Sequence, residues 1–504
     1  MKPKALAISS FITLFAALVI PVQPVAQSSE DHRGRPRYKL VDIGLGGPQS
    51  AVFEFALTLN NRGAVVGMAE TSTADPNYPN FSPFVGFGNP DRFIQHGFLW
   101  QDGVLTDLGA LTDSSQVSAI NTRGVAAGVS ENGLIDPLNG FLAVHAVVWN
   151  DGQIIDLGTL EGGYESLAND INDRGQVAGA SQNAIPDPFG YGGVQTRAVL
   201  WHNREIQDLG TLGTGNDAIA LFVNDRGQIA GWSYTNSTAN PVTGAPTQDP
   251  YLWRDGKMLD LGTLGGTVGA PNALNNRDQV VGYSNVPGDV GCPSACEVHP
   301  FLWSGGVLTD LGTFGGSSGV AAWINHAGEI VGWAYLQGDQ IFHAFLWKNE
   351  VKTDLGTLDG DLTSDAHGIN SKGQVVGSSE NGLSSRGFLW ENGKMFDLNT
   401  LVSPGSKLNL YFPTIINDRG EIAGQGQLPN GDIHAFLLIP CDESHRGHED
   451  CEEAAGSVSA AGENSLAPAS QSDVIEVGIT PREIATRIQA RFGRSRGFLF
   501  WPRK

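Results

Sequence analysis

One motif recurs along the chain, and its repetition limits the possible folds more than any other feature. It reads HAFLWKNEVKTDLGTLDG at His343–Gly360, HPFLWSGGVLTDLGTFGG at His299–Gly316 and RAVLWHNREIQDLGTLGT at Arg197–Thr214. A unit of this size cannot bury its apolar faces alone, so the repetition indicates copies that pack against one another. The sequence therefore predicts a repeat architecture.

Three short patterns define the repeating unit, and each occurs eight times when its variants are included. An apolar triplet ends in tryptophan at Trp100, Trp149, Trp201, Trp253, Trp303, Trp347 and Trp390, and Phe436-Leu437-Leu438 is a copy without it. Asp-Leu-Gly or a variant begins at Asp42, Asp107, Asp156, Asp208, Asp260, Asp310, Asp354 and Asp397. Asn-x-x-Gly begins at Asn60, Asn121, Asn172, Asn224, Asn325, Asn370 and Asn417, and the Asn275 copy lacks the glycine.

The residues at the predicted turns indicate where the strands of each unit begin and end. Asx-Gly pairs such as Asp102-Gly103 and Asn392-Gly393 separate the tryptophan triplet from Asp-Leu-Gly, which favours a type I′ hairpin. Asn-x-x-Gly fits a longer hairpin that places glycine in the left-handed region. Each unit then holds two hairpins and four short strands, the usual content of one β-propeller blade. The alternative is a β-solenoid, whose turns are usually shorter.

The two ends of the repeat region favour a closed ring over a solenoid. The region begins in mid-unit at Tyr38–Gly44 and ends with the complementary part at His434–Ile439. Pairing these strands would complete an eighth blade and remove open sheet edges. We therefore predict an all-β fold: a propeller of eight four-stranded blades closed by pairing of the N- and C-terminal strands. Asn-x-x-Gly joins the two inner strands, Asp-Leu-Gly lies outermost, and the seven tryptophans pack between blades.

These motifs resemble the HAF-repeat family of bacterial extracellular repeat proteins. His343-Ala344-Phe345 and His434-Ala435-Phe436 carry the name-giving motif unchanged, whereas His96-Gly97-Phe98 and His299-Pro300-Phe301 depart from it. The resemblance covers residues 38–440 and implies secretion and a propeller-like fold. It implies no activity, so it carries no catalytic residue over to this chain.

The segments outside the repeats suggest export. Residues 1–26 combine Lys2 and Lys4, an apolar run and small residues near Ala26, as in a cleavable signal peptide; a membrane anchor is the alternative. Residues 27–37 form a linker. Residues 441–479 contain a cysteine-bounded loop and an acidic, disordered segment. Residues 480–504 predict a short basic amphipathic helix or tail that contacts a membrane or a partner. We expect a secreted protein, with the periplasm or outer cell surface as alternatives.

Charge and cysteine content limit the partners. The 504 residues carry a formal charge of −22, and such a surface repels phosphate backbones, which argues against nucleic acid as a partner. We expect the chain to act as a monomer. Outside the reducing cytosol, cysteines at these positions predict two local disulfides, Cys292–Cys296 and Cys441–Cys451, and a zinc site is the alternative.

The units differ mainly between the second strand and the tryptophan strand. Long inserts occur at Met68–Gln95, Val129–Val144, Ala180–Thr196, Trp232–Asp249 and Tyr283–Val298. These inserts should share one face of the ring, and loops on a rigid scaffold often bind ligands. The first insert contains aromatic residues that suit sugar stacking or a protein contact, or that fold the insert back onto the propeller: Tyr78, Phe81, Phe84, Phe87 and Phe93.

Acidic residues on the inserts make calcium a candidate cofactor, because calcium prefers oxygen ligands. The residues are Asp75, Asp91, Asp136, Asp187 and Asp289, although no D-x-D-x-D-G loop is present and acidic loops are usually solvated. We expect no other cofactor. The repeated histidines and the aspartates of Asp-Leu-Gly should be spread around the ring, so we interpret them as hydrogen-bonding links between strands.

Two classes of function are consistent with this sequence. The first is a secreted, non-enzymatic binding or scaffold module that takes an extracellular glycan or protein through the insert loops. The second is an enzyme, either a hydrolase or lyase acting on polysaccharide or a quinone-dependent dehydrogenase. The H-E-x-x-H motif is absent. The G-x-S-x-G spacing at Gly315–Gly319 and Gly493–Gly497 does not stand between a predicted strand and a predicted helix, as a nucleophile elbow requires. We therefore assign no catalytic residue and favour the binding module.

Overall fold

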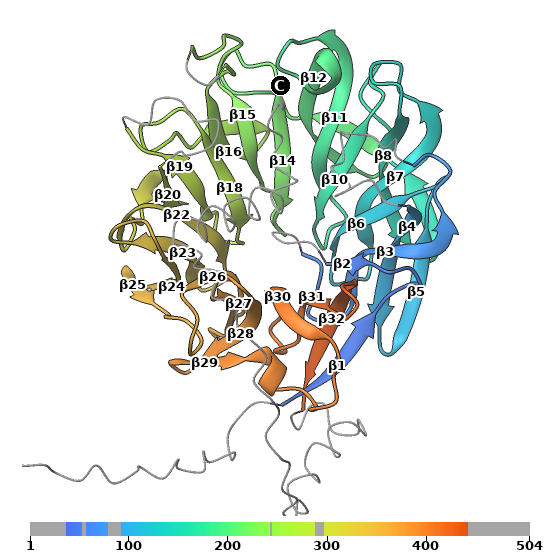
Figure 1. Cartoon of the computed structure of the whole chain (residues 1–504). Coiled ribbons are helices and arrows are strands. Elements are labelled where there is room, and N and C mark those ends of the chain that lie inside the picture. Colours follow the sequence, from blue (N-terminus) through green and yellow to red (C-terminus); the bar gives the residue numbers. More distant parts are fainter. Residues whose placement is uncertain (1–36, 53–56, 79–91, 242–243, 288–296, 442–504) are drawn as a thin grey trace, which may run out of the picture. The chain divides into compact units, whose positions relative to one another are not determined.

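The computed structural model describes residues 37–52, 57–78, 92–241, 244–287 and 297–441. In these residues the chain forms eight four-stranded antiparallel sheets arranged as a ring, which is a β-propeller (Figure 1). The predicted fold is therefore confirmed. The predicted signal peptide, the residues from Asp442 onward and three of the four cysteines lie outside the described residues. No helix in the described part has the length and apolar character to cross a membrane.

The sheets follow the chain order, and we number them as blades 1 to 8. Blades 1 to 4 comprise β2 (Ser50–Ala51), β3 (Val65–Ala74), β4 (Phe93–Gln101), β5 (Val104–Gly109); β6 (Ser115–Ile120), β7 (Ala126–Ile135), β8 (Leu142–Asn150), β9 (Gln153–Asp156); β10 (Ser166–Ile171), β11 (Val177–Pro186), β12 (Val194–His202), β13 (Glu205–Asp208); and β14 (Ala218–Val223), β15 (Ile229–Tyr234), β16 (Gln248–Arg254), β17 (Lys257–Asp260). A short 3₁₀ turn, η2 (Tyr191–Gly193), precedes β12.

Blades 5 to 8 continue the pattern. They comprise β18 (Gly269–Leu274), β19 (Val280–Asn285), β20 (Val298–Ser304), β21 (Val307–Asp310); β22 (Gly315–Ile324), β23 (Ile330–Leu336), β24 (Phe342–Lys348), β25 (Val351–Asp354); β26 (Thr363–Ile369), β27 (Val375–Glu380), β28 (Ser385–Glu391), β29 (Lys394–Asp397); and β30 (Asn409–Ile416), β31 (Ile422–Gln427), β32 (Ile433–Pro440) with β1 (Tyr38–Ile43). The 3₁₀ turn η3 (Leu398–Thr400) follows β29.

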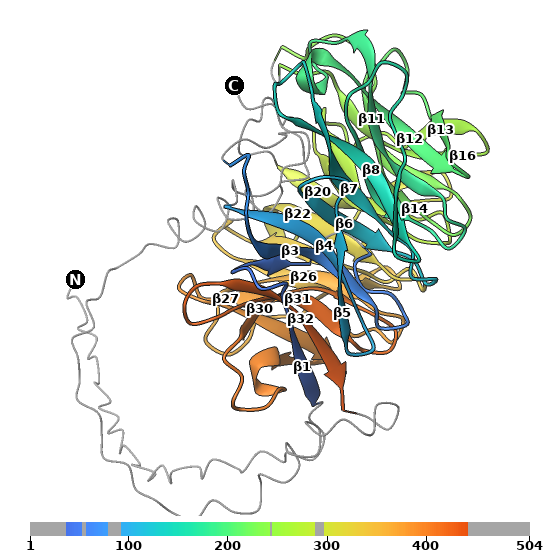
Figure 2. The same ribbon diagram turned by 90° about the vertical axis from the view of Figure 1, so that its right-hand side faces the viewer.

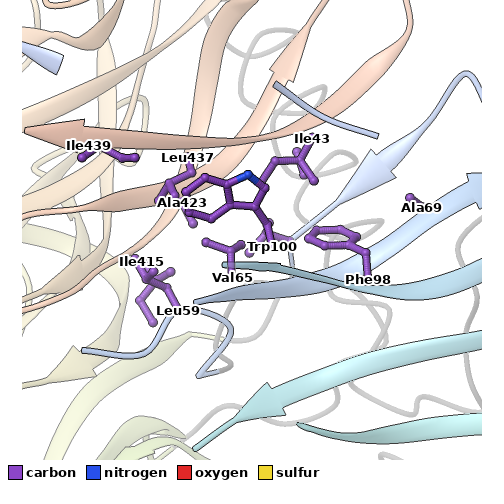
Figure 3. Close-up of a cluster of buried hydrophobic side chains, with 12 residues drawn as sticks. Ile43, Leu59, Val65, Ala69, Phe98, Trp100, Ile415, Ala423, Leu437 and Ile439 are labelled. Carbon is purple, nitrogen blue, oxygen red and sulfur yellow. The ribbon is translucent and has the colours of Figure 1, made fainter. Parts of the chain in front are cut away.

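The ring closes through the two ends of the repeat region. β1 pairs antiparallel with β32 from Tyr38–Pro440 to Ile43–Ala435 and supplies the outermost strand of blade 8. Figures 1 and 2 both show β1 beside β32. Trp100 of blade 1 packs in one buried cluster with Leu437 and Ile439 of blade 8, so apolar burial continues across the closure (Figure 3). This pairing removes the open edge that each strand would otherwise present.

The outer hairpins take the predicted type I′ geometry. Asp102 and Gly103 have φ values of 50° and 83°, so both central residues are left-handed. Asn203-Arg204 and Asn349-Glu350 adopt the same geometry without glycine. Their asparagine tolerates positive φ better than most residues, but the second position of each turn is unfavourable for an L-residue. Tertiary context decides the conformation there.

The Asn-x-x-Gly turns do more than the sequence predicts. Asn172 Oδ1 accepts from the N–H groups of Arg174 and Gln176 within its own turn, as expected for a capping side chain. Its Nδ2 donates to Asn224 O in the next blade at 2.8 Å. The same bond recurs between all neighbouring blades at 2.8 to 3.1 Å, and Asn417 Nδ2 donates to Asn60 O across the closure. Eight asparagines thus form a closed hydrogen-bonded ring.

The tryptophans lie in the buried clusters between neighbouring blades. Trp149 packs with Ala64 and Val66 of blade 1 and donates Nε1–H to Leu108 O at 3.1 Å. Trp201 is 1% exposed and packs against the alanine-rich strands of blade 2. Trp253, Trp347 and Trp390 are half-buried against analogous clusters. Small inner residues such as Ala119 and Ala168 let the blades approach closely around the axis.

Candidate binding face

The two faces of the ring are built by different connections. The turn face carries the Asn-x-x-Gly turns and the outer hairpins. The insert face carries the connections from the second to the third strand of each blade. The longest of these connections join β3 to β4, β15 to β16 and β19 to β20, whereas β27 and β28 are joined by only a few residues. The insert face therefore carries most of the variation between blades.

The inserts of blades 1 to 3 begin as strand extensions. β3, β7 and β11 each run for 10 residues, and their last residues leave the core and become exposed. The sequence predicted that Met68–Gln95 is entirely insert, but β3 continues to Ala74, which pairs with Phe93 of β4. The alternation in Glu70–Thr73 of polar and β-branched residues supports this extension.

Three of the candidate calcium ligands have a structural role in these hairpins. Asp75, Asp136 and Asp187 each precede a proline and accept a hydrogen bond from the N–H two residues later, at 2.7 to 2.8 Å. Asp136 and Asp187 are buried, contrary to the expectation of solvated acidic loops, because the neighbouring blade covers each turn. Asp91 and Asp289 lie outside the described residues. Within the described residues, no group of three or more His, Cys, Asp or Glu side chains could hold a metal ion.

Each of these aspartates lies near an acidic residue of the next blade. In blade 1, Asn77 follows Asp75 and its Nδ2 donates to Asp113 at 3.1 Å. In blade 2, Asn139 Nδ2 donates to Asp136 at 2.8 Å and to Glu165 at 3.5 Å. In blade 3 no such amide follows Asp187. The Oδ2 atoms of Asp187 and Asp217 accept no hydrogen bond from any described residue.

Burial perturbs several of these carboxyl groups. Burial raises the pKa of Asp217 to about 7, the Thr196 N–H opposes the shift, and the nearby Asp187 adds to it. Burial likewise raises the pKa of Glu131 to about 7, against the Ser114 N–H, with repulsion from Asp75 and Asp113. Neither group reaches solvent, since Glu131 is 4% and Asp217 is 2% exposed. Such groups favour their protonated forms below about pH 7.

The repeated histidines link the third and fourth strands, as predicted. His343 Nδ1 lies 2.9 Å from Asp354 Oδ2, and equivalent pairs are His96–Asp107, His145–Asp156, His299–Asp310 and His434–Asp42. Arginine takes this place in Arg197–Asp208 and Arg386–Asp397. Burial opposes ionisation of Asp354, but bonds from His343 and the Gly356 N–H outweigh it and hold its pKa below the usual value.

Blade 4 breaks this pattern. Asp249 occupies the position of the histidine and faces Asp260, so two carboxyl groups meet where every other blade pairs a carboxylate with a histidine or arginine. Burial and the repulsion from Asp260 raise the pKa of Asp249 to about 7. One proton shared between the two groups relieves the repulsion below that pH.

Exposed apolar side chains occur on the hairpins of blades 1 to 3 and on the connection from blade 2 to blade 3. Six of them are 42% to 66% exposed: Tyr78, Leu134, Ile135, Leu138, Tyr164 and Ile185. We call these six residues the apolar row. Blade 7 adds Leu362 and Leu383. Of the sequence-predicted aromatic candidates, Tyr78 belongs to the row, Phe93 is half-buried at the start of β4, and Phe81, Phe84 and Phe87 lie outside the described residues.

Sequence reasoning missed most of the apolar row. A signal was nevertheless present, because Leu134-Ile135 and Ile185-Pro186 stand directly before Asp-Pro turns. Apolar residues beside a turn that faces solvent have no core of their own to enter. The row is consistent with a contact surface, since exposed apolar residues that gather in one place often mark interaction sites.

Comparison with known proteins identifies no family for this chain. No protein-family model and no curated protein matches its sequence. Among solved structures it is similar to a gluconolactonase from Xanthomonas campestris, at 11% identity, TM-score 0.26, over 48% of this chain and 78% of that one. It is also similar to TolB from Acinetobacter baumannii, at 10% identity, TM-score 0.29, over 74% and 79% of the two chains. Trypanosoma rangeli sialidase in complex with sialic acid shares 10% identity, TM-score 0.32, over 80% and 59%.

Proposed function

We propose that this protein is a secreted, non-enzymatic binding module that takes an extracellular protein ligand through the insert face of blades 1 to 3. The observation that carries the proposal is the apolar row. Its members are mainly aliphatic, and aliphatic side chains fit the apolar centre of a protein contact better than a sugar ring. Tyr78 and Tyr164 are the two members that suit stacking on a glycan.

A rigid support makes this surface suitable for binding. The hairpins extend directly from β3, β7 and β11, whose inner halves are buried in the blades. The Asp-Pro turns and their contacts with the next blade fix the ends of the hairpins. A surface that is already ordered loses little conformational entropy when a ligand binds.

The second candidate is an enzyme acting on polysaccharide, and the perturbed carboxyls of the insert face favour it. Paired carboxyls with a raised pKa are the usual acid and base of glycoside hydrolysis. A general acid must reach the substrate, however, and Glu131 and Asp217 are buried and bonded to backbone N–H groups. We therefore place binding first.

A matched pair of variants tests the proposal. The first replaces Leu134, Ile135 and Ile185 with serine. The control replaces Val104, Val307 and Val351, which are 61% to 63% exposed at the start of outer strands away from the insert face. Both sets should leave stability within about 0.5 kcal/mol, because the side chains are exposed.

The binding measurement uses the immobilised chain against extracellular proteins from its own source and against a glycan array. We expect at least one protein to be retained saturably by the wild type and the control, and lost from the apolar-row variant. Equal retention by both variants would contradict the proposed site. Saturable glycan binding that depends on Tyr78 would replace the protein ligand with a carbohydrate. Polysaccharide cleavage that disappears in Glu131→Gln or Asp217→Asn would favour the enzyme.

A further inference from the structure

The turn face carries a ring of positive charge on a strongly acidic protein. The third residue of the Asn-x-x-Gly turn is basic and exposed in seven of the eight blades, while blade 6 has Ala327. We call these residues the basic ring: Arg62, Arg123, Arg174, Arg226, Arg277, Lys372 and Arg419. The chain as a whole has a formal charge of −22, so its composition does not reveal that basic residues line this face. Acidic residues on the same face lie in the outer hairpins, such as Asp102, and in four of the Asn-x-x-Gly turns: Asp173, Asp225, Asp278 and Asp418.

On one side of the ring, each basic side chain forms a hydrogen bond or an ion pair within the protein. In blades 3 to 5, Arg174 and Arg277 donate to carbonyl groups of the next turn at 3.3 and 3.0 Å. Arg226 pairs with Asp278 at 3.4 Å, and Asp278 also accepts from Arg254. Asp278 is the residue that replaces glycine in the blade 5 turn, at φ 60°.

On the other side of the ring, three basic side chains form no such contact with the described residues. The side chains of Lys372, Arg62 and Arg123, in blades 7, 1 and 2, form no hydrogen bond or ion pair with any residue in the described part of the chain. Arg419 of blade 8 lies between them and contacts Glu421 at 3.3 Å and Arg62 O at 3.1 Å. We call Arg62, Arg123 and Lys372 the open arc. Asp418 also lies here, but it accepts hydrogen bonds from Asn61 and from the Ser371 N–H.

The chain leaves the propeller beside this arc. β32 ends at Pro440, whose ring lies 3.5 Å from the place where a β-carbon on Gly420 would be. Gly420 directly follows Arg419. The Cys441 N–H then donates to Arg37 O at 2.8 Å, which fixes the exit point on the turn face.

The segment that follows has the complementary charge. Residues 442–453 contain Asp442, Glu443, Glu449, Asp450, Glu452 and Glu453, against the single Arg446. If Cys441 and Cys451 form a bridge, the loop between them reaches about 15 Å, roughly half of its extended length, and neighbouring sheets pack about 10 Å apart, so the loop can reach the adjacent turns. The bridge between Cys441 and Cys451 that the sequence predicts would keep these acids close to the exit point.

We propose that residues 442–453 dock on the open arc of the basic ring. The carboxylates pair with the guanidinium groups of Arg62 and Arg123 and with the Lys372 ammonium. This inference does not depend on the function proposed for the apolar row.

Cross-linking of the full chain tests the contact directly. A carbodiimide joins a carboxylate to an amine only when the two are in contact. We expect Lys372 to be linked to carboxylates of residues 442–453 at low salt, and the link to disappear at high salt because exposed ion pairs are screened. Lys257 belongs to blade 4, on the other side of the ring, and should not be linked to this segment. Absence of the Lys372 link at low salt would overturn the proposal.

Hydrogen exchange with matched variants provides the second test. Arg62→Gln, Arg123→Gln and Lys372→Gln are combined in one variant, and Arg174→Gln, Arg226→Gln and Arg277→Gln in the control. We expect exchange in residues 442–453 to accelerate on the order of tenfold in the first variant, since several exposed ion pairs are lost together, and to change little in the control. Equal exchange in all three proteins would contradict docking.

The remaining alternative is that the ring binds an external polyanion. Polygalacturonate is titrated against the full chain and against a variant with the six acidic residues of 442–453 changed to Asn or Gln. If the segment occupies the arc, affinity should rise on the order of tenfold in the variant, because the internal competitor is gone. Equal affinity for both proteins would assign the arc to an external ligand and overturn the proposal.

Discussion

The two faces of this propeller follow opposite rules. On the turn face, eight copies of one turn place eight asparagines in a closed ring, and each makes the same bond to the next blade. On the insert face, the corresponding connections differ in length, composition and burial from blade to blade. The repeated turns therefore form the scaffold of the ring. The connections that differ between blades form surfaces that can distinguish one ligand from another.

A substitution in the apolar core between blades should cause the largest loss of stability. Trp201→Ala removes a side chain that is 1% exposed and packs between blades 2 and 3. We expect a loss of about 3 to 5 kcal/mol in the free energy of unfolding, measured by denaturant titration. Trp201→Phe should cost less than half as much, since the Trp201 N–H has no acceptor among the described residues. Equal losses would mean that the ring system does not stabilise the interface by packing.

A substitution in the asparagine ring should cause the next largest loss of stability. Asn172→Ala removes three bonds within the turn, two from backbone N–H groups and one to Gln176 Oε1, and the bond to Asn224 O, so we expect a loss of about 2 to 4 kcal/mol. Asn417→Ala makes the same change at the closure of the ring. Similar losses would show that the closure is as strong as any other blade interface. Asn150→Ala, at an exposed strand end, serves as the control and should change stability by less than about 0.5 kcal/mol.

A substitution on the insert face should change the free energy of unfolding in a pH-dependent way, whereas a substitution on the turn face should not. The pKa of Asp217 is raised from 3.8 to about 7 in the folded protein, so its contribution to stability is fully present below 3.8 and is lost as the pH rises through about 7. Asp217→Asn can still accept the Thr196 N–H bond. We expect the variant to gain about 1 to 2 kcal/mol over the wild type at about pH 8 and little at about pH 4. The same gain at both pH values would contradict burial of an ionisable pair. Asp151→Asn in an exposed hairpin is the control.

The smallest effect should come from restoring the strand link in blade 4. Asp249→His would pair with Asp260 as His343 pairs with Asp354, and should raise stability by about 0.5 to 1 kcal/mol above pH 7, where Asp249 loses its proton. The reverse change, His343→Asp, should lower stability by a similar amount over the same pH range. Denaturant titration as a function of pH measures both. A loss in Asp249→His would mean that the two carboxyl groups are better accommodated than the repeat comparison implies.

Part of the candidate binding face could be predicted from the sequence. The lengths of the inserts place them correctly between the second and third strands, and Tyr78 is exposed as a ligand-binding residue must be. Leu134, Ile135 and Ile185 were missed because an apolar residue in a strand pattern predicts burial. Their strands extend past the edge of the neighbouring blade, and sequence periodicity does not reveal where that edge lies.

The sequence by itself determined the number of blades, the order of strands within each blade and the closure by β1 and β32. These features depend on local turn chemistry and on the copy number of the unit, and both are visible in one dimension. Only the tertiary structure decided that the asparagines link into a ring, that Asp187 and Asp217 of neighbouring blades are both buried, and that β32 ends beside the turn of Arg419. Each of these outcomes joins residues of different blades or of distant turns, so it depends on what the neighbouring unit presents rather than on any local pattern.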